Sequence, residues 1–341
     1  PLLGRVLITG GCGFIGRAIA SRLAHSQCDV VLLDDLSTGV VNGLARRRHV
    51  KIRVGSVLDP SAVREAARGC DLVLHLASLV GKRLVSERRE LAYATSVGGA
   101  QNILDHTGDI PVVLFSSSAV YGVEAAGTVG EAAAIDDQGA LDYDGGFRGY
   151  ALGKLHMERL AANHARNGRR VLIVRPFNIV GPGQTGRYGM VIPRFVKSAL
   201  RDRPLMVYGD GRQTRSFSHV RTFVSVILRL IATRDAWRPP QVPVNIGTPR
   251  ATSIQRLAEV VLRVTSSRSP VRYVAYDTVY TGQRDVLERN PDVTRCQTLV
   301  GSVRWPGIDA IVRDVARDES PHPRAHRDEA MPALRPSDGE A

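Results

Sequence analysis

The chain has 341 residues, of which 43% are hydrophobic and 23% charged, and its formal net charge is +13. This length suits two domains, or one large domain with an added lobe, and the apolar content is sufficient for a full core. No apolar run is long enough to span a bilayer, so we predict no membrane contact. The dispersed arginines and an aromatic content of only 5% also argue against nucleic-acid binding. We interpret the positive charge as a solvated surface, with attraction of a nucleotide diphosphate as the alternative.

The four cysteines, Cys12, Cys28, Cys70 and Cys296, are scattered and form no metal-binding spacing. We interpret them as buried thiols of a cytoplasmic protein that has no metal centre. No signal-peptide pattern opens the chain, although it begins at Pro1 rather than Met, which leaves removal of a leader open.

Short apolar runs alternate with helical stretches over the first half of the chain. Strands are predicted at 6–9, 30–34, 51–54, 72–76, 112–115 and 171–174. Helices are predicted at about 14–24, 60–68, 86–107 and 150–167. This alternation predicts an α/β Rossmann fold, a doubly wound parallel sheet with right-handed crossovers. Functional residues of such sheets gather at the carboxyl ends of the strands, where Gly10, Asp34, Ala77 and Ser117 fall.

The pattern changes after Pro176, where turns multiply between shorter elements and helices are predicted at 191–201 and 253–264. We expect residues 1–175 to form a nucleotide-binding domain whose sheet is completed by later segments. Residues 176–317 are expected to be mainly a smaller α/β substrate-binding lobe, interleaved with the first domain. Residues 318–341 have almost no large apolar side chains, and we predict that they form a disordered tail.

A glycine-rich loop with glycines at positions 10, 13 and 16 follows the first predicted strand and opens a helix. Glycine lets the backbone turn tightly there and approach a pyrophosphate at the helix N-terminus. Asp34 ends the second strand, where a carboxylate accepts both ribose hydroxyls of an adenosine and repels a 2′-phosphate. The adjacent segment 35–39 holds no arginine. These features predict NAD rather than NADP.

Tyr150 and Lys154 lie four positions apart and therefore share one face of the predicted helix. A lysine ammonium beside a phenol, whose ordinary pKa is about 10, stabilises the tyrosinate. Tyr150 can then act as a base near neutral pH. Because this pair follows a nucleotide-binding fold and a serine run at 116–118, we interpret it as a catalytic pair.

Eight motifs occur in one order along the chain. They are TGGCGFIG (9–16), LDDLSTG (33–39), HLAS (75–78), SSSAVYG (116–122), YALGK (150–154), RPFNIVGPGQ (175–184), VIPRF (191–195) and YGDGRQTRSF (208–217). Together they resemble the extended short-chain dehydrogenase/reductase family, in its nucleotide-sugar branch, over about residues 4–315.

The resemblance implies a role for each matching position. The catalytic set is Ser117, Tyr150 and Lys154. The implied NAD contacts are Gly10, Gly13, Phe14, Ile15, Gly16, Asp34, Asp35, Ser37, Thr38, Ser56, Val57, Leu76, Ala77, Ser78, Tyr150 and Lys154. The implied substrate contacts are Ser117, Ser118, Asn178, Arg187, Val191, Met206, Tyr208, Arg215 and Arg289.

Among the substrate contacts, Met206 and Tyr208 match the stretch that sandwiches the uracil in the family. Asn178 and Arg215 match residues that hold the sugar and the diphosphate, and Arg289 lies in a second region expected to meet the diphosphate. Purely structural roles stay open: Asn178 as a turn cap, Arg215 and Arg289 as ion-pair residues. The chain departs from the family pattern at Ser56, Ser96, Ser216 and Thr222, where the family has an acid or an asparagine.

The family resemblance also implies a reaction that begins by oxidising the sugar at C4, with Tyr150 as the base. The 4,6-dehydratases carry carboxylates at the positions of Ser118 and Ala119, and UDP-glucuronate decarboxylases carry Glu at that of Ala119. Because this chain has no carboxylate there, we predict a UDP-sugar 4-epimerase.

The predicted substrate is UDP-glucuronate, with Arg187 meeting its C6 carboxylate unless it is a solvated loop residue. UDP-glucose and UDP-galactose are the alternative substrates. A UDP-glucuronate decarboxylase, a nucleotide-sugar dehydratase and a non-enzymatic nucleotide sensor stay open. We also expect a homodimer that pairs through the helices at 86–107 and 150–167.

Overall fold

Seven parallel strands form the central sheet, in the order β12-β7-β5-β4-β1-β2-β3. The strands are β1 (Arg5–Thr9), β2 (Asp29–Asp34), β3 (Val50–Val54), β4 (Leu72–His75), β5 (Val112–Phe115), β7 (Val171–Pro176) and β12 (Val244–Ile246). The structure is a computed structural model that describes residues 4–41, 43–123, 125, 127–133, 135, 147–187, 189–240, 242–281 and 284–320. The strand order reverses between β1 and β4, as in dinucleotide-binding folds, which confirms the predicted fold.

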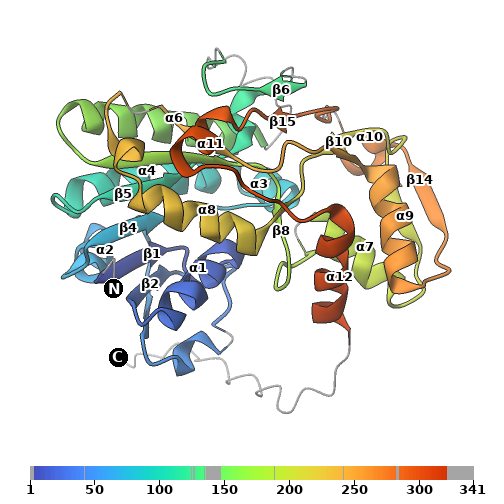
Figure 1. Ribbon diagram of the computed structural model, residues 1–341, viewed down its shortest axis with the longest axis horizontal. Helices are drawn as coiled ribbons and strands as arrows, with labels where there is room; N and C mark the ends of the chain where they lie inside the picture. The colour runs from blue at the N-terminus through green and yellow to red at the C-terminus, as the bar shows by residue number, and fades with distance from the viewer. Residues whose placement is uncertain are drawn as a thin grey trace, which may run out of the picture.

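The strands are apolar throughout because helices cover both faces of the sheet. In β1, Val6 and Ile8 point into one core and Leu7 into the other, and all three are fully buried. The first face is covered by α1 (Phe14–His25), α8 (Val220–Ala232) and α11 (Thr294–Val300). The second is covered by α2 (Pro60–Ala67), α4 (Arg89–His106) and α6 (Phe147–Arg166). Figure 1 shows α1 and α8 on one side of the sheet, with α4 and α6 beyond it.

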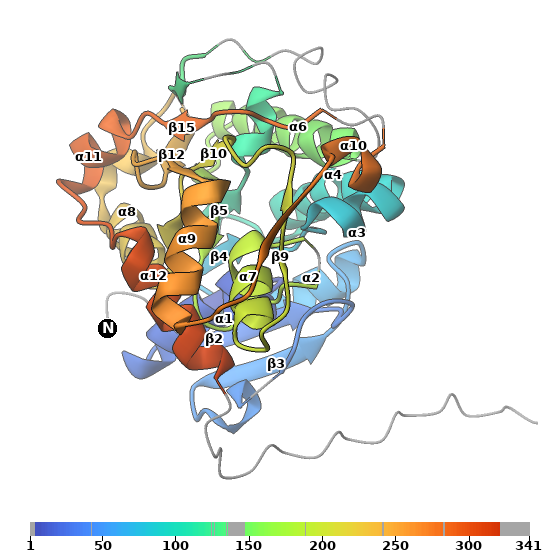
Figure 2. The same ribbon diagram turned by 90° about the vertical axis from the view of Figure 1, so that its right-hand side faces the viewer.

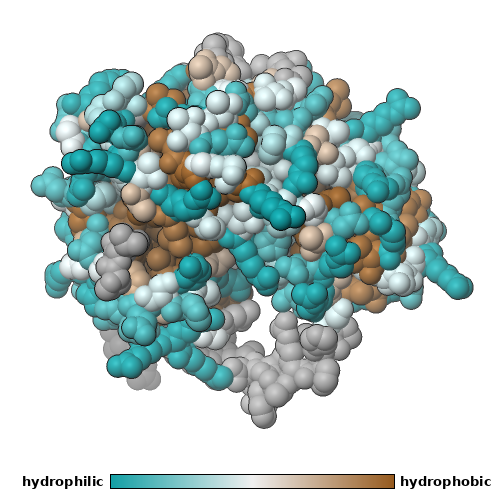
Figure 3. Space-filling view, in the orientation of Figure 1, coloured by the Kyte–Doolittle hydropathy of each residue, from teal (hydrophilic) through white to brown (hydrophobic). Residues whose placement is uncertain are grey.

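A third core holds the smaller lobe together, at the right of Figure 1 and facing the viewer in Figure 2. Its helices are α7 (Val191–Ala199), α9 (Ile254–Thr265) and α12 (Ile308–Glu319). They pack around β9 (Leu205–Tyr208) and β14 (Val271–Val274), which pair in parallel. Hydrophilic side chains cover most of the face seen in Figure 3, where apolar residues gather in patches near α8 and α9.

The remaining described elements are short. The helices are α3 (Lys82–Glu87) and α10 (Tyr276–Val279), with one-turn helices η1 (Leu44–Arg46), η2 (Ser118–Tyr121) and η3 (Arg234–Trp237). The two-residue strands are β6 (Thr128–Val129), β8 (Ile179–Val180), β10 (Thr214–Arg215), β11 (Ser218–His219), β13 (Thr252–Ser253) and β15 (Asn290–Pro291). They form the pairs β10–β13, β11–β8 and β15–β6.

Strand β12 and helix α8 come from the 176–317 segment and belong to the sheet domain. Two features differ from the sequence-based expectations. The helix expected at 86–107 is divided into α3 and α4 by Arg88, whose φ of −133° and ψ of 51° are not helical. Helix α12 continues to Glu319, so residues 318 and 319 are helical, and the rest of the predicted tail from residue 321 lies outside the described residues. No helix within the described ranges is long and apolar enough to cross a membrane.

Candidate active site

A cavity of about 600 Å³ opens between the carboxyl ends of the sheet strands and the smaller lobe. All of the predicted cofactor-binding residues line it, as do Ser117, Ser118, Asn178, Val191, Tyr208, Arg215 and Arg289 from the predicted substrate set. Parallel strands whose order reverses create such a crevice at their carboxyl ends. The fold therefore brings together motifs that are far apart in the sequence.

The glycine loop lies at the floor of one end of this cavity. Gly10 has a φ of 64°, and a Cβ atom there would lie 2.8 Å from the backbone nitrogen of Ala77. A Cβ atom on Gly16 would lie 2.5 Å from the carbonyl oxygen of Gly10. Only glycine fits at these two positions, because the loop, the start of α1 and the end of β4 are in close contact. The N-terminus of α1 is therefore open to a pyrophosphate.

Asp34 lies beside the glycine loop at the end of β2. Its two carboxylate oxygens accept hydrogen bonds from the backbone nitrogens of Cys12 and Leu36, each at 2.9 Å. These bonds fix the carboxylate, and each oxygen keeps a lone pair for a ribose hydroxyl. Burial raises the pKa of Asp34, and the two backbone bonds oppose that rise. The tight glycine turn together with this oriented carboxylate fits the pyrophosphate and adenosine ribose of NAD.

The predicted catalytic set lies where β5 and α6 meet the cavity. Ser117 precedes η2, and its Oγ accepts a hydrogen bond from the backbone nitrogen of Ala119 at 3.1 Å. Because the oxygen acts as an acceptor in that bond, its hydroxyl proton can be donated to a ligand. Lys154 Nζ donates to the carbonyl oxygen of Phe115 at 2.7 Å and lies 5.9 Å from the centroid of the Tyr150 ring. The phenol and the ammonium thus border the same cavity.

Burial dominates the electrostatics of Lys154, which is only 2% exposed. Burial lowers the pKa of Lys154 to about 7, and the negative charge of Glu158 one helical turn away opposes that fall. Glu158 is itself paired with Arg175 through bonds of 2.9 Å and 2.6 Å, and Arg175 also donates to the hydroxyl of Tyr121 at 2.9 Å. A buried charge network therefore begins one helical turn after Lys154.

Aromatic rings and arginines border the opposite end of the cavity. The Arg194 guanidinium lies 4.2 Å from the centroid of the Tyr208 ring, and Tyr280 meets that ring edge-on at 5.9 Å. Arg215 forms an ion pair of 2.8 Å with Asp285 and also donates to the carbonyl oxygen of Val286 at 2.6 Å. Flat rings next to fixed guanidinium groups suit a nucleobase followed by a diphosphate.

Two predicted substrate contacts do not line the cavity. Arg187 is exposed, whereas Gln184 and Thr185 of the same loop line the cavity. Met206 lies two residues before the cavity-lining Tyr208 in β9, and its carbonyl oxygen accepts a hydrogen bond from Arg194 at 3.0 Å. The contact of Arg187 with a C6 carboxylate stays a prediction.

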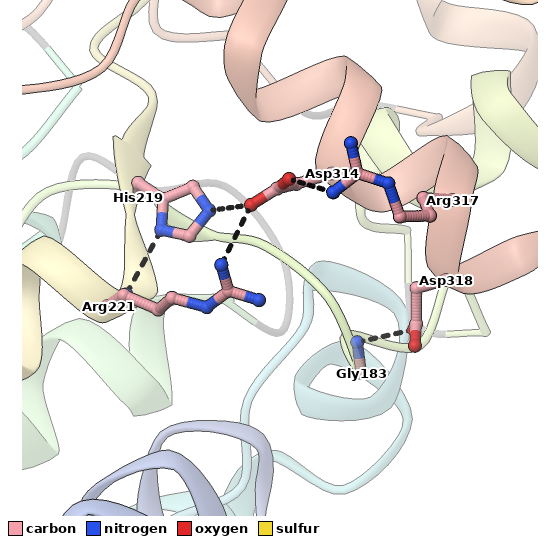
Figure 4. A network of polar contacts seen from close by, with 6 residues as sticks. All are labelled: Gly183, His219, Arg221, Asp314, Arg317 and Asp318. Atoms are coloured by element: carbon pink, nitrogen blue, oxygen red, sulfur yellow. Dashed lines mark hydrogen bonds and ion pairs between the residues drawn. The ribbon is translucent and has the colours of Figure 1, made fainter.

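The loop at 181–184 forms part of the cavity wall and is held from both sides. The backbone nitrogen of Gly183 donates to Asp318 of α12 at 2.8 Å, and its carbonyl oxygen accepts from Arg17 of α1 at 2.8 Å. Figure 4 shows the same face of α12, where Asp314 meets His219 and Arg221 at 3.2 Å each. Both lobes thus position this wall.

Several cavity-lining residues are absent from the sequence-based set: Phe147, Arg194, Tyr276, Tyr280, Arg284 and Asp285. Arg194 lies within the VIPRF motif, which could have identified it. Tyr276 and Tyr280 are four residues apart, a spacing that places both rings on one helical face, 5.1 Å between centroids. Asp285 has no such local signal, because only the fold brings it to Arg215.

Comparison with known proteins assigns the family. The chain matches the model of the NAD dependent epimerase/dehydratase family over residues 6–247. A UDP-N-acetyl-alpha-D-glucosaminuronate decarboxylase of Bacillus cytotoxicus is 34% identical over 301 residues, covering 86% of this chain and 91% of that protein. MoeE5 in complex with UDP-glucuronic acid and NAD has a TM-score of 0.77 and 27% identity, covering 92% of this chain and 98% of that chain.

A further solved structure supports the fold alone. UDP-glucuronic acid 4-epimerase from Bacillus cereus, in complex with UDP-glucuronic acid and NAD, has a TM-score of 0.80 at 22% identity, covering 92% of this chain and 98% of that chain. The family match covers the glycine loop, Asp34 and the Ser117, Tyr150 and Lys154 set. The chain therefore belongs to the NAD dependent epimerase/dehydratase family, as an enzyme whose cofactor is NAD.

Proposed function

We propose that this enzyme is a UDP-sugar 4-epimerase that interconverts UDP-glucuronate and UDP-galacturonate. The observation that carries the proposal is Ala119, which lies two residues after Ser117, is 4% exposed and lines the cavity. The family resemblance implies a carboxylate at this position in UDP-glucuronate decarboxylases, and alanine supplies none. A cavity that can oxidise C4 but has no acid or base beside the sugar favours return of the same sugar with C4 inverted.

The carboxylates that line the cavity, among the described residues, are Asp34, Asp35 and Asp285. Asp34 and Asp35 lie at the nucleotide end, where each accepts backbone hydrogen bonds. Asp285 is engaged by Arg215. Each of the three thus has a partner other than the serine run, which favours a cavity without a general acid or base for elimination.

In the proposed reaction Tyr150 removes the proton of the 4-hydroxyl, and Ser117 donates a hydrogen bond to the same oxygen. Bound NAD supplies the oxidation at C4 and the later reduction. Lys154 stabilises the tyrosinate by its charge. Arg215, already oriented by Asp285, holds the diphosphate while the 4-keto sugar turns over. Tyr150 then returns its proton to the 4-oxygen as C4 is reduced on its opposite face.

Two relatives support a UDP-hexuronate as the substrate. MoeE5 binds UDP-glucuronic acid, and the Bacillus cytotoxicus protein acts on UDP-N-acetylglucosaminuronate. The second relative also makes decarboxylation a candidate function, because it is 34% identical over 301 residues. UDP-glucose is the alternative substrate, since MoeE5 is also known in complex with it.

Product analysis tests the proposal. The purified protein is incubated with UDP-glucuronate and, separately, with UDP-glucose, and the products are analysed by anion-exchange chromatography and mass spectrometry. We expect UDP-galacturonate, which has the same mass as the substrate but a different retention. A UDP-pentose formed with release of carbon dioxide would establish the decarboxylase instead. Much faster conversion of UDP-glucose would establish the hexose epimerase. The Tyr150→Phe variant is the control for contaminating activity.

A further inference from the structure

Arg289 makes main-chain contacts that a simple diphosphate-binding residue would not need. It is 6% exposed. Its Nη1 donates to the carbonyl oxygen of Ser118 at 2.9 Å, and its Nη2 donates to the carbonyl oxygen of Gly122. Ser118 is the first residue of η2, and Gly122 is the residue that ends it. One guanidinium group therefore holds both ends of this one-turn helix.

The turn held in this way determines where Ser117 lies. Ser117 is the residue before η2, and its side chain accepts a hydrogen bond from Ala119 inside the turn. The backbone nitrogen of Gly122 closes the turn on the carbonyl of Ala119. A single turn of 3₁₀ helix has poor internal hydrogen-bond geometry. The two bonds from Arg289 therefore contribute directly to the position of the Ser117 hydroxyl.

Arg289 reaches the turn from a segment anchored beside it. Strand β15 follows Arg289 and pairs in parallel with β6. The backbone nitrogen of Asn290 donates to Gly127 at 2.8 Å, and that of Asp292 donates to Val129 at 2.9 Å. The residues just before Arg289 line the substrate end of the cavity, where Val286 accepts a bond from Arg215. Arg289 thus connects the substrate-end segment with the serine turn.

We propose that Arg289 is a positioning residue, which acts on the reaction through Ser117 and does not supply the main contact to the diphosphate. The planar guanidinium suits this role because its two Nη atoms reach two acceptors at once, which a lysine ammonium cannot do with the same fixed geometry. The inference rests on the proposed function only in that Ser117 assists the oxidation at C4. A misplacement of such a group by about 1 Å lowers rates by roughly 100-fold.

A double-mutant cycle tests the proposal. The rate of NAD reduction in a single turnover with UDP-glucuronate is measured for the wild type, Arg289→Met, Ser117→Ala and the double variant. We expect Arg289→Met to lower this rate by roughly 10- to 100-fold. In the Ser117→Ala background the same change should lower the rate by less than about threefold, because coupled residues are not additive. If the double variant loses the product of the two single-variant fold-losses in rate, Arg289 does not act through Ser117.

Binding of UDP alone, measured by calorimetry, separates positioning from diphosphate binding. We expect the dissociation constant of UDP to change by less than about threefold in Arg289→Met, the range of independent sites. A weakening of tenfold or more with an unchanged reduction rate would overturn the proposal. Arg250→Met is the matched control, because exposed Arg250 also donates to a main-chain carbonyl, that of Trp305, and does not line the cavity. Its reduction rate should equal that of the wild type.

A second variant covers loss of folding. If Arg289→Met does not fold, Arg289→Lys, which keeps the charge, enters the same cycle. We expect a smaller loss of reduction rate in Arg289→Lys, and again a loss of less than about threefold in the Ser117→Ala background. A wild type that reduces NAD with UDP-glucuronate but forms no epimer would contradict the proposed function, and the Arg289 comparison would still be decided by the reduction rates. A wild type that reduces no NAD with any UDP-sugar would contradict both.

Discussion

The buried ion pair behind Lys154 provides the sharpest test of the site's electrostatics. Glu158 and Arg175 have side chains that are 7% and 5% exposed and are joined by two hydrogen bonds. Replacing Glu158 with Gln keeps the shape of the side chain but removes its charge. Arg175 then retains a buried positive charge with only neutral acceptors, the glutamine oxygen and the hydroxyl of Tyr121. Such half-removed pairs destabilise proteins by about 3–5 kcal/mol.

The same substitution should change the pH dependence of turnover. Glu158 opposes the effect of burial on the pKa of Lys154, which is about 7. For charges about 6 Å apart, the i,i+4 spacing, at an effective dielectric constant of about 20, the interaction is about 2.8 kcal/mol. That energy corresponds to at most about two pKa units. Because loss of the negative charge disfavours the ammonium form, the pKa of Lys154 falls further.

In the proposed mechanism Lys154 must stay protonated to stabilise the tyrosinate, so loss of its proton determines the alkaline limb of the kcat profile. In Glu158→Gln this limb should therefore move to lower pH by about one to two units. The midpoint of thermal unfolding should fall by about 6–10 °C, at about 2 °C per kcal/mol. Glu259→Gln is the control, because its pair with Arg256 is more than half exposed, at 52% and 57%, and should contribute less than about 1 kcal/mol. An alkaline limb that stays in place or moves to higher pH in the folded variant would refute this reasoning.

Four other predictions concern the site and the assembly. Tyr150→Phe should lower turnover by roughly 10²–10⁴ while UDP still binds, and a near wild-type rate would remove Tyr150 from its assigned role. Ala119→Glu should make UDP-glucuronate yield a UDP-pentose, detected by mass spectrometry, and a variant that still yields only the epimer would show that a carboxylate there does not determine the reaction. The purified protein should carry NAD or bind it far better than NADP, which equal affinities in calorimetry would contradict. Sedimentation should show a homodimer paired through α4 and α6, where Leu91 and Tyr93 are 40% and 36% exposed, and a monomer at micromolar concentration would argue against it.

Much of the sheet was predictable because buried parallel strands are apolar on both faces. The six strands expected up to residue 174 all occur, with ends that differ by at most two residues. Strand β12 was missed because it is only three residues long and includes Asn245, which is polar yet fully buried. Asn245 is satisfied by Glu131, Tyr121 and the carbonyl of Val129, all more than 100 residues away in the sequence. Only tertiary contacts make such a residue a strand residue.

The residues of the site also divide into those placed by local sequence pattern and those placed by tertiary contacts. The place of the glycine loop, Asp34, Tyr150 and Lys154 on the cavity wall could be predicted, because it follows from local spacing. Arg289 could be placed near the site, but its acceptors lie 171 and 167 residues earlier in the chain. Likewise, Arg187 carries the charge expected for a uronate contact, but it is exposed and is not among the residues that line the cavity. Charge and position in a motif do not determine which atoms a side chain reaches.

The distribution of charged and apolar residues along the cavity also bears on the reaction type. At the substrate end, Arg194 is held by the carbonyl of Met206 and Arg215 by Asp285, so these cations are oriented before a ligand arrives. Groups oriented in advance lose little freedom on binding and can hold a nucleoside diphosphate firmly. Two residues after Ser117, in contrast, the wall includes Ala119, whose side chain offers the sugar no charged contact. A firmly held diphosphate and a weakly held sugar are what rotation of a 4-keto intermediate requires, because a strong contact to one face of the sugar would oppose the turn.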